Sequence, residues 1–413
     1  MNYRILIVGA LGLALAACEA PSPDPVEEVD DMAEARRIAK SSIIVDTHID
    51  VPMRVHETGE DVTIATESGD FDHPRAVAGG LNAPFMSIYT GAHLEAAGRS
   101  REVAEELIDI VDNIVAKAPD KFAIARSPAD VRRHFDEGIM SLALGMENGS
   151  PLEGDLAALK YFFDRGIRYI TLAHSLSNHL SDSSYDANRQ WGGLSDFGIE
   201  VVREMNRFGI MIDVSHLSDD AFWQVLKVSS APVIASHSSA RSFTPGWERN
   251  IDDEMIRALA ENGGVVQVNF GSGFISPEAR EYDNKRIPKA REYMARNPEV
   301  TMSEMLRDWN RAYIAENGPY PYATLDDVLD HFDHIVSLAG IDHVGIGSDY
   351  DGVGDTLPVG VKDVSSYPNL IAGLLRRGYS EADIKKILGE NLLRVWEAVE
   401  ARAVRKQETG PGA

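Results

Sequence analysis

The sequence predicts an α/β fold, specifically a (β/α)8 TIM-type barrel, and three observations predict it. Eight short apolar segments rich in β-branched residues recur along the chain, and each ends in polar residues. Segments with helical periodicity lie between them. The apolar segments are almost continuously apolar, as strands are when both faces of a parallel sheet are buried. Eight such units fit one barrel, with a doubly wound open sheet as the structural alternative.

The predicted strands are numbered one to eight in chain order. They cover residues 43–48, 84–89, 139–146, 167–173, 210–215, 232–236, 264–270 and 343–348. The helices predicted between them cover residues 99–118, 152–165, 195–208, 218–229, 252–261 and 324–338. Ser218 and Thr324 open two of these helices and are followed by acidic residues, as helix N-termini prefer.

Two segments depart from this alternation. Residues 271–321, between strands seven and eight, are polar and contain helical pieces at 288–295 and 302–314 but no strand. We interpret them as an insertion over the barrel mouth. Residues 380–402 predict one or two closing helices, with Gly389 near their junction.

Composition excludes several classes of protein. The 413 residues are 44% hydrophobic and 25% charged, which is typical of a globular protein. A formal net charge of -25 argues against a nucleic-acid partner, because a phosphate backbone would be repelled. Cys18 is the only cysteine, so an internal disulfide and a cysteine-ligated zinc site are both impossible. Any metal chemistry must use histidine and carboxylates.

The N-terminal region predicts a lipoprotein signal peptide at residues 1–17. Its apolar run is too short to span a bilayer, which needs roughly 20 residues, but it suits a signal peptide. The run ends in Leu-Ala-Ala-Cys18, which resembles the bacterial lipobox, where the peptide is cut before a cysteine that is then lipidated. A plain secretory signal with an incidental cysteine is the alternative.

An acidic, proline-rich tether is predicted to follow at residues 18–35. Residues 36–413 would then form a single barrel domain. Glu19 follows the cysteine in place of the aspartate that usually retains lipoproteins in the inner membrane. We therefore expect a lipid anchor on Cys18 in the bacterial cell envelope, in the outer membrane and facing the periplasm.

Polar residues at the ends of the predicted strands form one set. In a barrel the carboxyl ends of all strands converge on one rim, so these residues can meet there. The set consists of His48, Asp50, Glu147, His174, His216, His237 and Asp349. Each residue alone is a weak signal, and the alternative is that each separately caps its strand. The other eight histidines lie in loops, helices or at a strand start, where a solvated or structural role is the default.

The ligand types in this set predict a metal centre. Imidazole and carboxylate without thiolate suit zinc, and also manganese or cobalt. His48 and Asp50 share one face of an extended chain and can bind one metal, while His216 and His237, on adjacent strands, can bind a second. Glu147 has two oxygens and can bridge. Two metals about 4 Å apart hold a hydroxide and polarise a carbonyl, as amide hydrolysis requires, with Asp349 as the proton shuttle.

Six motifs resemble the membrane dipeptidase (renal dipeptidase) family of binuclear zinc peptidases. They are VDTHID at 45–50, GMENG at 145–149, RYITLAH at 168–174, NRFGIMIDVSH at 206–216, ASHSSA at 235–240 and GIGSDYDG at 345–352. The resemblance extends from about residue 43 to 398. It implies two zinc ions per chain, on the ligands given above. It also suggests a homodimer.

The resemblance further implies how the substrate is bound. His174 would stabilise the oxyanion of the tetrahedral intermediate, Arg249 would pair with the substrate's C-terminal carboxylate, and Asp349 would contact the attacking water and the substrate ammonium. The segment from His237 to Arg249 is about one residue longer than in the family, which leaves Arg241 as a rival for the carboxylate. Met86 stands where the family usually has tryptophan, so one wall of the pocket is expected to differ.

Three functions stay open, and the first is favoured. It is a zinc-dependent dipeptidase acting on dipeptides, including those with a C-terminal D-residue, because one arginine and one aspartate would measure a fixed length between two charged ends. The second is another binuclear-metal barrel hydrolase for lactones, cyclic amides or phosphoesters. Many of those use a modified lysine at the end of strand four, where this chain has His174. The third is a non-catalytic envelope lipoprotein, which would be expected to have lost ligands.

Overall fold

A closed parallel sheet forms the centre of the computed structural model, which describes residues 31–297 and 308–408. Its strands are β1 (Val45–Ile49), β2 (Ala83–Tyr89), β4 (Met140–Glu147), β5 (Ile167–Thr171), β6 (Met211–Asp213), β7 (Ile234–Ala235), β8 (Val265–Val268) and β9 (Val344–Ile346). They are ordered β2-β1-β9-β8-β7-β6-β5-β4, and β2 pairs with β4 to close the ring. The predicted (β/α)8 barrel is confirmed, and the open doubly wound sheet is excluded.

An additional strand, β3 (Phe122–Ile124), lies outside this ring. In the described sheet it pairs only with Met140–Leu142 at the start of β4. It was not predicted, because three residues are too few to show a strand pattern. The helix that follows it, α6 (Pro128–Glu137), was also missed, although Ser127 caps it by accepting from the backbone N–H of Asp130.

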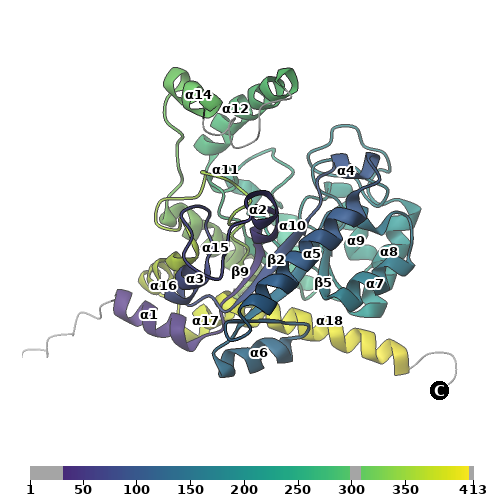
Figure 1. Ribbon diagram of the computed structural model, residues 1–413, viewed down its shortest axis with the longest axis horizontal. Coiled ribbons are helices and arrows are strands. Elements are labelled where there is room, and N and C mark those ends of the chain that lie inside the picture. Colours follow the sequence, from purple (N-terminus) through teal and green to yellow (C-terminus); the bar gives the residue numbers. More distant parts are fainter. Residues whose placement is uncertain (1–30, 298–307, 409–413) are drawn as a thin grey trace, which may run out of the picture. The chain divides into compact units, whose positions relative to one another are not determined.

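Helices surround the strands (Figure 1). Those in the first half are α1 (Asp31–Ser41), α2 (Val51–Thr58), α3 (His73–Gly79), α4 (His93–Ala96), α5 (Ser100–Lys117), α7 (Ala157–Arg165), α8 (Asp196–Phe208) and α9 (Asp219–Val228). Those in the second half are α10 (Asp253–Glu261), α15 (Leu325–Ala339), α16 (Tyr367–Arg376), α17 (Glu381–Lys385) and α18 (Asn391–Glu408). The caps predicted at Ser218 and Thr324 are both present, and Thr324 forms a capping box with Asp327.

The predicted insertion between strands seven and eight is helical in its described part. It contains α11 (Ser272–Ile275), α12 (Pro277–Arg296) and α14 (Asn310–Asn317), and α12 and α14 lie together beyond α11 in Figure 1. Helix α12 begins well before the predicted 288–295, because Ser276 caps it and Pro288 lies inside the helix instead of starting it. The first part of the predicted piece 302–314 lies outside the described residues.

The N-terminal boundary of the barrel domain differs from the sequence expectation. Helix α1 begins at Asp31, so residues 31–35 of the predicted tether are helical, and Ala35 and Ile38 are buried in the core. The rest of the tether, the signal peptide and Cys18 lie outside the described residues. In the described part of the chain, no helix is long and apolar enough to cross a membrane.

Apolar side chains fill the amino-terminal half of the barrel interior. Phe85 and Tyr169 point inward from β2 and β5, with ring centroids 5.5 Å apart. Trp396 of the closing helix α18 is fully buried against Phe85, at a centroid distance of 5.3 Å. A π-helical turn at Lys386–Glu390 joins α17 to α18 and contains Gly389, the predicted junction. A Cβ on Gly389 would lie 2.7 Å from the carbonyl oxygen of Ile43, so β1 approaches the chain closely here.

His331 is one of the eight histidines for which a solvated or structural role is predicted. It is fully buried in α15. Its Nδ1 accepts from the backbone N–H of Ala240 at 3.1 Å, and its Nε2 donates to the carbonyl oxygen of Ile275 at 3.0 Å. The bond accepted by Nδ1 requires the neutral ring, and burial lowers the pKa of His331 to about 4.

We expect His331→Gln to remove part of the pH dependence of stability. Because the folded pKa lies below the unfolded value, the contribution of His331 is complete above about pH 6.5 and is lost as pH falls toward 4, by up to about 3 kcal/mol. Urea unfolding at pH 7.5 and pH 5 measures this loss. The variant should lose less stability between the two pH values than the wild type, and the exposed control His93→Gln should behave like the wild type. Equal losses in all three proteins would contradict this account.

Candidate metal centre and active site

The predicted rim residues meet at the carboxyl ends of the barrel strands. The contributing positions are His48 in β1, Asp50 after it, Glu147 at the end of β4, His174 after β5, His216 after β6, His237 after β7 and Asp349 after β9. They form three overlapping groups, each with ligand atoms within 4.8 Å of one another: His48, Glu147 and His237; Glu147, His174 and His216; His48, Asp50 and Asp349. The structure therefore brings all seven predicted residues together.

Glu147 lies at the centre of these groups. Its Oε1 is 3.1 Å from Nε2 of His216 and 3.4 Å from Nε2 of His237. Its Oε2 is 3.2 Å from Nε2 of His48 and accepts from the Ser87 hydroxyl at 3.1 Å. His48 Nε2 also lies 3.4 Å from Oδ2 of Asp50. One oxygen of the buried carboxylate thus faces His216 and His237, and the other faces His48.

The donor atoms fit divalent metal ions. Nε2 of His216 and Nε2 of His237 are only 2.8 Å apart and converge on the same oxygen of Glu147. Nε2 of His48 is buried and has no hydrogen-bond partner, a state that costs free energy unless another group binds it. Imidazole nitrogens and carboxylate oxygens without thiolate are ligands typical of zinc and of neighbouring first-row metals.

Hydrogen bonds behind the histidines set which nitrogen points into the site. The Tyr169 hydroxyl donates to the carbonyl oxygen of Thr47 at 3.1 Å, so it accepts from Nδ1 of His48 at 2.8 Å. The Ser236 hydroxyl donates to Oδ2 of Asp213 at 2.6 Å and accepts from Nδ1 of His237 at 2.7 Å. In both histidines Nδ1 is held by a hydroxyl, so Nε2 is the nitrogen that points into the site.

The protonation of three side chains in the site also suits metal binding. Burial, together with Arg249 and the neighbouring imidazoles, holds the pKa values of His216 and His237 well below their usual range, so both rings are neutral. Burial alone would raise the pKa of Glu147, but the imidazoles of His48 and His174 hold it well below its usual range. A metal ligand must have a free lone pair, and the neutral rings of His216 and His237 and the ionised carboxylate of Glu147 meet this requirement.

We expect Ser236→Ala to weaken metal binding by about 10–100-fold, because His237 loses the partner that orients its ring. Competition with a fluorescent chelator measures the affinity directly, without reference to activity. The matched control is Ser242→Ala, an exposed serine outside the site. Equal affinity of Ser236→Ala and the wild type would show that the Asp213–Ser236–His237 chain does not position the ligand.

Asp349 lies at the edge of the centre in a constrained backbone conformation. Its φ is 65°, its side chain is buried, and its Oδ2 accepts from Nδ2 of Asn269 at 2.7 Å. A Cβ on Gly352 would lie 2.3 Å from Oδ1 of Asp349 and from Oδ2 of Asp50, so only glycine fits there. Burial, together with the like charges of Asp50 and Glu147, raises the pKa of Asp349 to about 7.

His174 and Arg249 border the same space. The His174 side chain is 19% exposed, and its ring centroid lies 4.3 Å from that of His216. Arg249 is 1% exposed and places Nη2 3.0 Å from Nε2 of His216, while Nη1 donates to the Ser238 hydroxyl at 2.8 Å. Among the described residues no carboxylate forms an ion pair with Arg249, so a buried positive charge faces the metal centre.

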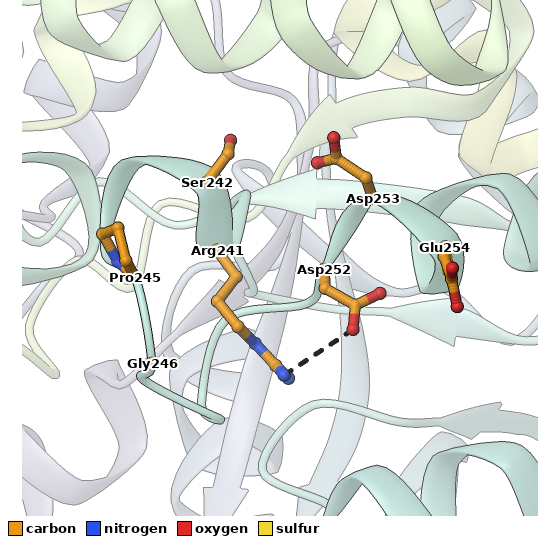
Figure 2. Close-up of a pocket in the computed structure, with 7 residues that line it drawn as sticks. All are labelled: Arg241, Ser242, Pro245, Gly246, Asp252, Asp253 and Glu254. Atoms are coloured by element: carbon orange, nitrogen blue, oxygen red, sulfur yellow. Dashed lines mark ion pairs between the residues drawn. The ribbon is translucent and has the colours of Figure 1, made fainter.

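Arg241, the rival predicted for the substrate carboxylate, lies elsewhere. Its guanidinium donates to both carboxylate oxygens of Asp219 at 2.7 and 2.5 Å and to the carbonyl oxygen of Asn250 at 2.6 Å. Figure 2 shows it in a separate pocket, where it points toward Asp252. Its hydrogen-bonding groups are already engaged, so the geometry favours Arg249.

The expectation that Met86 alters a pocket wall is wrong. Met86 is fully buried in the apolar cluster that contains helix residues, while Ser87, the next residue of β2, points to Glu147. Since successive side chains of a strand alternate, Met86 faces away from the site.

Several residues of the site were missed by the sequence analysis. Asn269 directly follows β8, but strand seven was predicted to extend to residue 270, so Asn269 was not recognised as a residue that ends a strand. Tyr169, Asp213 and Ser236 lie within or beside strands, and their roles behind the ligands show no sequence signal apart from a carboxylate in an apolar segment.

A (β/α)8 barrel with imidazoles and carboxylates converging at its carboxyl rim defines a metal-dependent hydrolase. The family model of membrane dipeptidases (Peptidase family M19) matches residues 32–410, and the chain belongs to this family. It is therefore a metallo-dipeptidase, as the resemblance implied.

Solved structures agree with this assignment. The chain is similar to the probable dipeptidase PvdM from Pseudomonas aeruginosa, with 30% sequence identity and a TM-score of 0.78 over 90% of this chain and 99% of that one. It is also similar to a metallopeptidase from Rhodobacter sphaeroides, solved with a phosphinate mimic of the dipeptide L-Ala-D-Ala. That comparison gives 27% identity and a TM-score of 0.70 over 87% of this chain and 99% of that one.

Proposed function

We propose that the enzyme is a zinc-dependent dipeptidase with two metal sites that share Glu147. His48 and Asp50 would hold one ion, and His216 and His237 the other, with manganese or cobalt as alternatives to zinc. The observation that carries this proposal is that Oε1 of Glu147 faces His216 and His237 while Oε2 faces His48. When bound, two zinc ions would supply a hydroxide at neutral pH and polarise the scissile carbonyl.

Asp349 is proposed to carry the proton. Asn269 holds its Oδ2, which leaves Oδ1 to accept a proton from the attacking water and return it to the leaving amine. The side chain of Asp349 also supplies a negative charge for the substrate ammonium.

His174 and Arg249 are proposed to bind the rest of the substrate. His174 is the most exposed of the four imidazoles, so it can reach the carbonyl oxygen and stabilise the oxyanion. Arg249 offers a buried guanidinium with no ion-pair partner among the described residues, which suits the C-terminal carboxylate. A guanidinium for the carboxylate and a carboxylate for the ammonium would together select a zwitterion of fixed length.

Dipeptides with a C-terminal D-residue are included among the proposed substrates. The structure of the Rhodobacter sphaeroides metallopeptidase holds a mimic of L-Ala-D-Ala, and that protein is similar to this chain over most of its length. The decisive experiment is a panel of L-L and L-D dipeptides, with metal content measured on the same preparation. We expect cleavage that a chelator abolishes and zinc restores. If metal-loaded protein cleaves no dipeptide, the proposed function is wrong.

A lipid anchor on Cys18 is proposed as well, with the protein held in the outer membrane and facing the periplasm. The proposal is supported by the lipobox-like Leu-Ala-Ala-Cys18 and by Glu19 after it. Mass spectrometry of the protein purified from membranes should find a lipidated N-terminal Cys18. A mature N-terminus that lacks Cys18 would exclude the anchor.

A further inference from the structure

An aromatic wall leads from the metal centre to the insertion. The Tyr185 ring lies 5.8 Å from the His216 ring and 6.1 Å from the ring of Trp247. Phe274 of α11 packs edge-on against Trp247 at 4.9 Å, and the guanidinium of Arg249 lies over Phe274 at 5.1 Å. We call Tyr185, Trp247 and Phe274 the aromatic wall. It therefore touches both the metal centre and the arginine proposed to bind the substrate carboxylate.

The insertion places a second arginine on this wall. Arg280, in the first turn of α12, stacks its guanidinium over the Trp247 ring at 4.2 Å. Trp247 in turn neighbours Tyr185, whose ring lies 5.8 Å from that of His216, so Arg280 is attached to the wall that begins at the metal centre.

Arg280 has a charge that no protein carboxylate neutralises at close range. Its Nε donates to Oδ1 of Asn284 at 3.0 Å, and among the described residues no ion pair involves it. The nearest acid, Asp283, is engaged by Arg286 at 3.0 Å and by the Tyr320 hydroxyl at 3.0 Å. The chain has 65 acidic and 40 basic residues, so an arginine without an acidic partner is unexpected in it. Arg280, stacked on the aromatic wall, is therefore available to bind the anionic group of a ligand.

We propose that Arg280 selects dipeptides whose C-terminal residue has an acidic side chain. The inference rests on the proposed function, because Arg249 takes the α-carboxylate of that residue. Arg249 lies over Phe274 and Arg280 lies over Trp247, and these two rings pack against each other. An acidic side chain on the C-terminal residue would extend along these two rings toward the second guanidinium, which can bind it with charge-assisted hydrogen bonds.

The test compares substrates of equal shape and different charge. The pairs are Ala-Glu with Ala-Gln and Ala-Asp with Ala-Asn, each with a D- and an L-residue at the C-terminus. For the wild type we expect kcat/KM to be about tenfold or more higher for the acidic member of a pair, mostly through KM, because the contact exists in ground and transition state alike.

Arg280→Gln should reduce this ratio to about one while kcat/KM for the neutral dipeptide stays within about threefold of the wild type. The matched control is Arg296→Gln at the other end of α12, where the arginine is 74% exposed and pairs with Glu292. It should keep the wild-type ratio.

Two results would overturn the inference. One is a wild-type ratio near one, and the other is a ratio that Arg280→Gln leaves unchanged. In both cases continued cleavage of neutral dipeptides would show that the dipeptidase proposal survives. An equal loss on acidic and neutral substrates in Arg280→Gln is a case of the second result, and it would assign Arg280 a structural role. Failure of the wild type on every dipeptide would instead refute the proposed function.

Discussion

Asp349→Asn is expected to retain its metal and to lose about 10²–10⁴-fold in kcat, the usual contribution of a general acid and base. The amide has the size of the carboxylate, and its oxygen can still accept from Asn269, so the backbone and the position of the side chain should be preserved. It cannot take up a proton at neutral pH. Steady-state kinetics on the best dipeptide and elemental analysis of the same sample measure the two effects.

The control for this variant is Asp355→Asn, in the same loop but with a side chain 82% exposed. It should keep both the metal and kcat. If Asp349→Asn loses metal in proportion to activity, Asp349 is a ligand, which its place in a group with His48 and Asp50 would allow. The proton-transfer role would then be wrong.

Glu147→Gln is expected to lose metal as well as activity. Each oxygen of Glu147 faces imidazole nitrogens at 3.1–3.6 Å, and glutamine replaces one oxygen with an N–H donor and removes the negative charge. We expect the metal content to fall from about two ions per chain to one or fewer, with activity below detection even in excess zinc. Titration with zinc followed by calorimetry would count the sites that remain.

Glu153→Gln is the matched control, since Glu153 is an exposed glutamate a short distance along the chain from Glu147. It should bind metal as the wild type does. Two tightly bound ions in Glu147→Gln would refute a shared carboxylate, and the centre would have to be divided differently among the other ligands.

The barrel and its rim could be predicted because both follow from a repeated pattern. Buried parallel strands are apolar throughout, so the polar residues that end them are conspicuous, and closure brings them together. His48 and Asp349 lie 301 positions apart in the sequence, yet each needed only its own strand end to be identified. Asn269 was missed because strand seven was predicted to extend to residue 270, whereas β8 ends at Val268.

Features that depend on tertiary contacts could not be predicted in this way. In the sequence Tyr169 looks like any aromatic residue of a buried strand. Only the folded barrel shows that its hydroxyl contacts Nδ1 of His48. Arg241 and Arg249 lie close together in one loop, and the distinction between them rests on Asp219 engaging the first. The insertion has no strand pattern, so the stacking of Arg280 on Trp247 became visible only in the structure.

The side chains packed below the metal centre restrict how substrate and products can enter and leave the barrel. Trp396 and Phe85 fill the amino-terminal end of the barrel, and Tyr169 continues this packing up to His48. Helix α18 therefore closes the barrel at its amino-terminal end. A dipeptide and the two amino acids made from it must all pass the carboxyl-terminal rim, so products have to leave before the next substrate can bind.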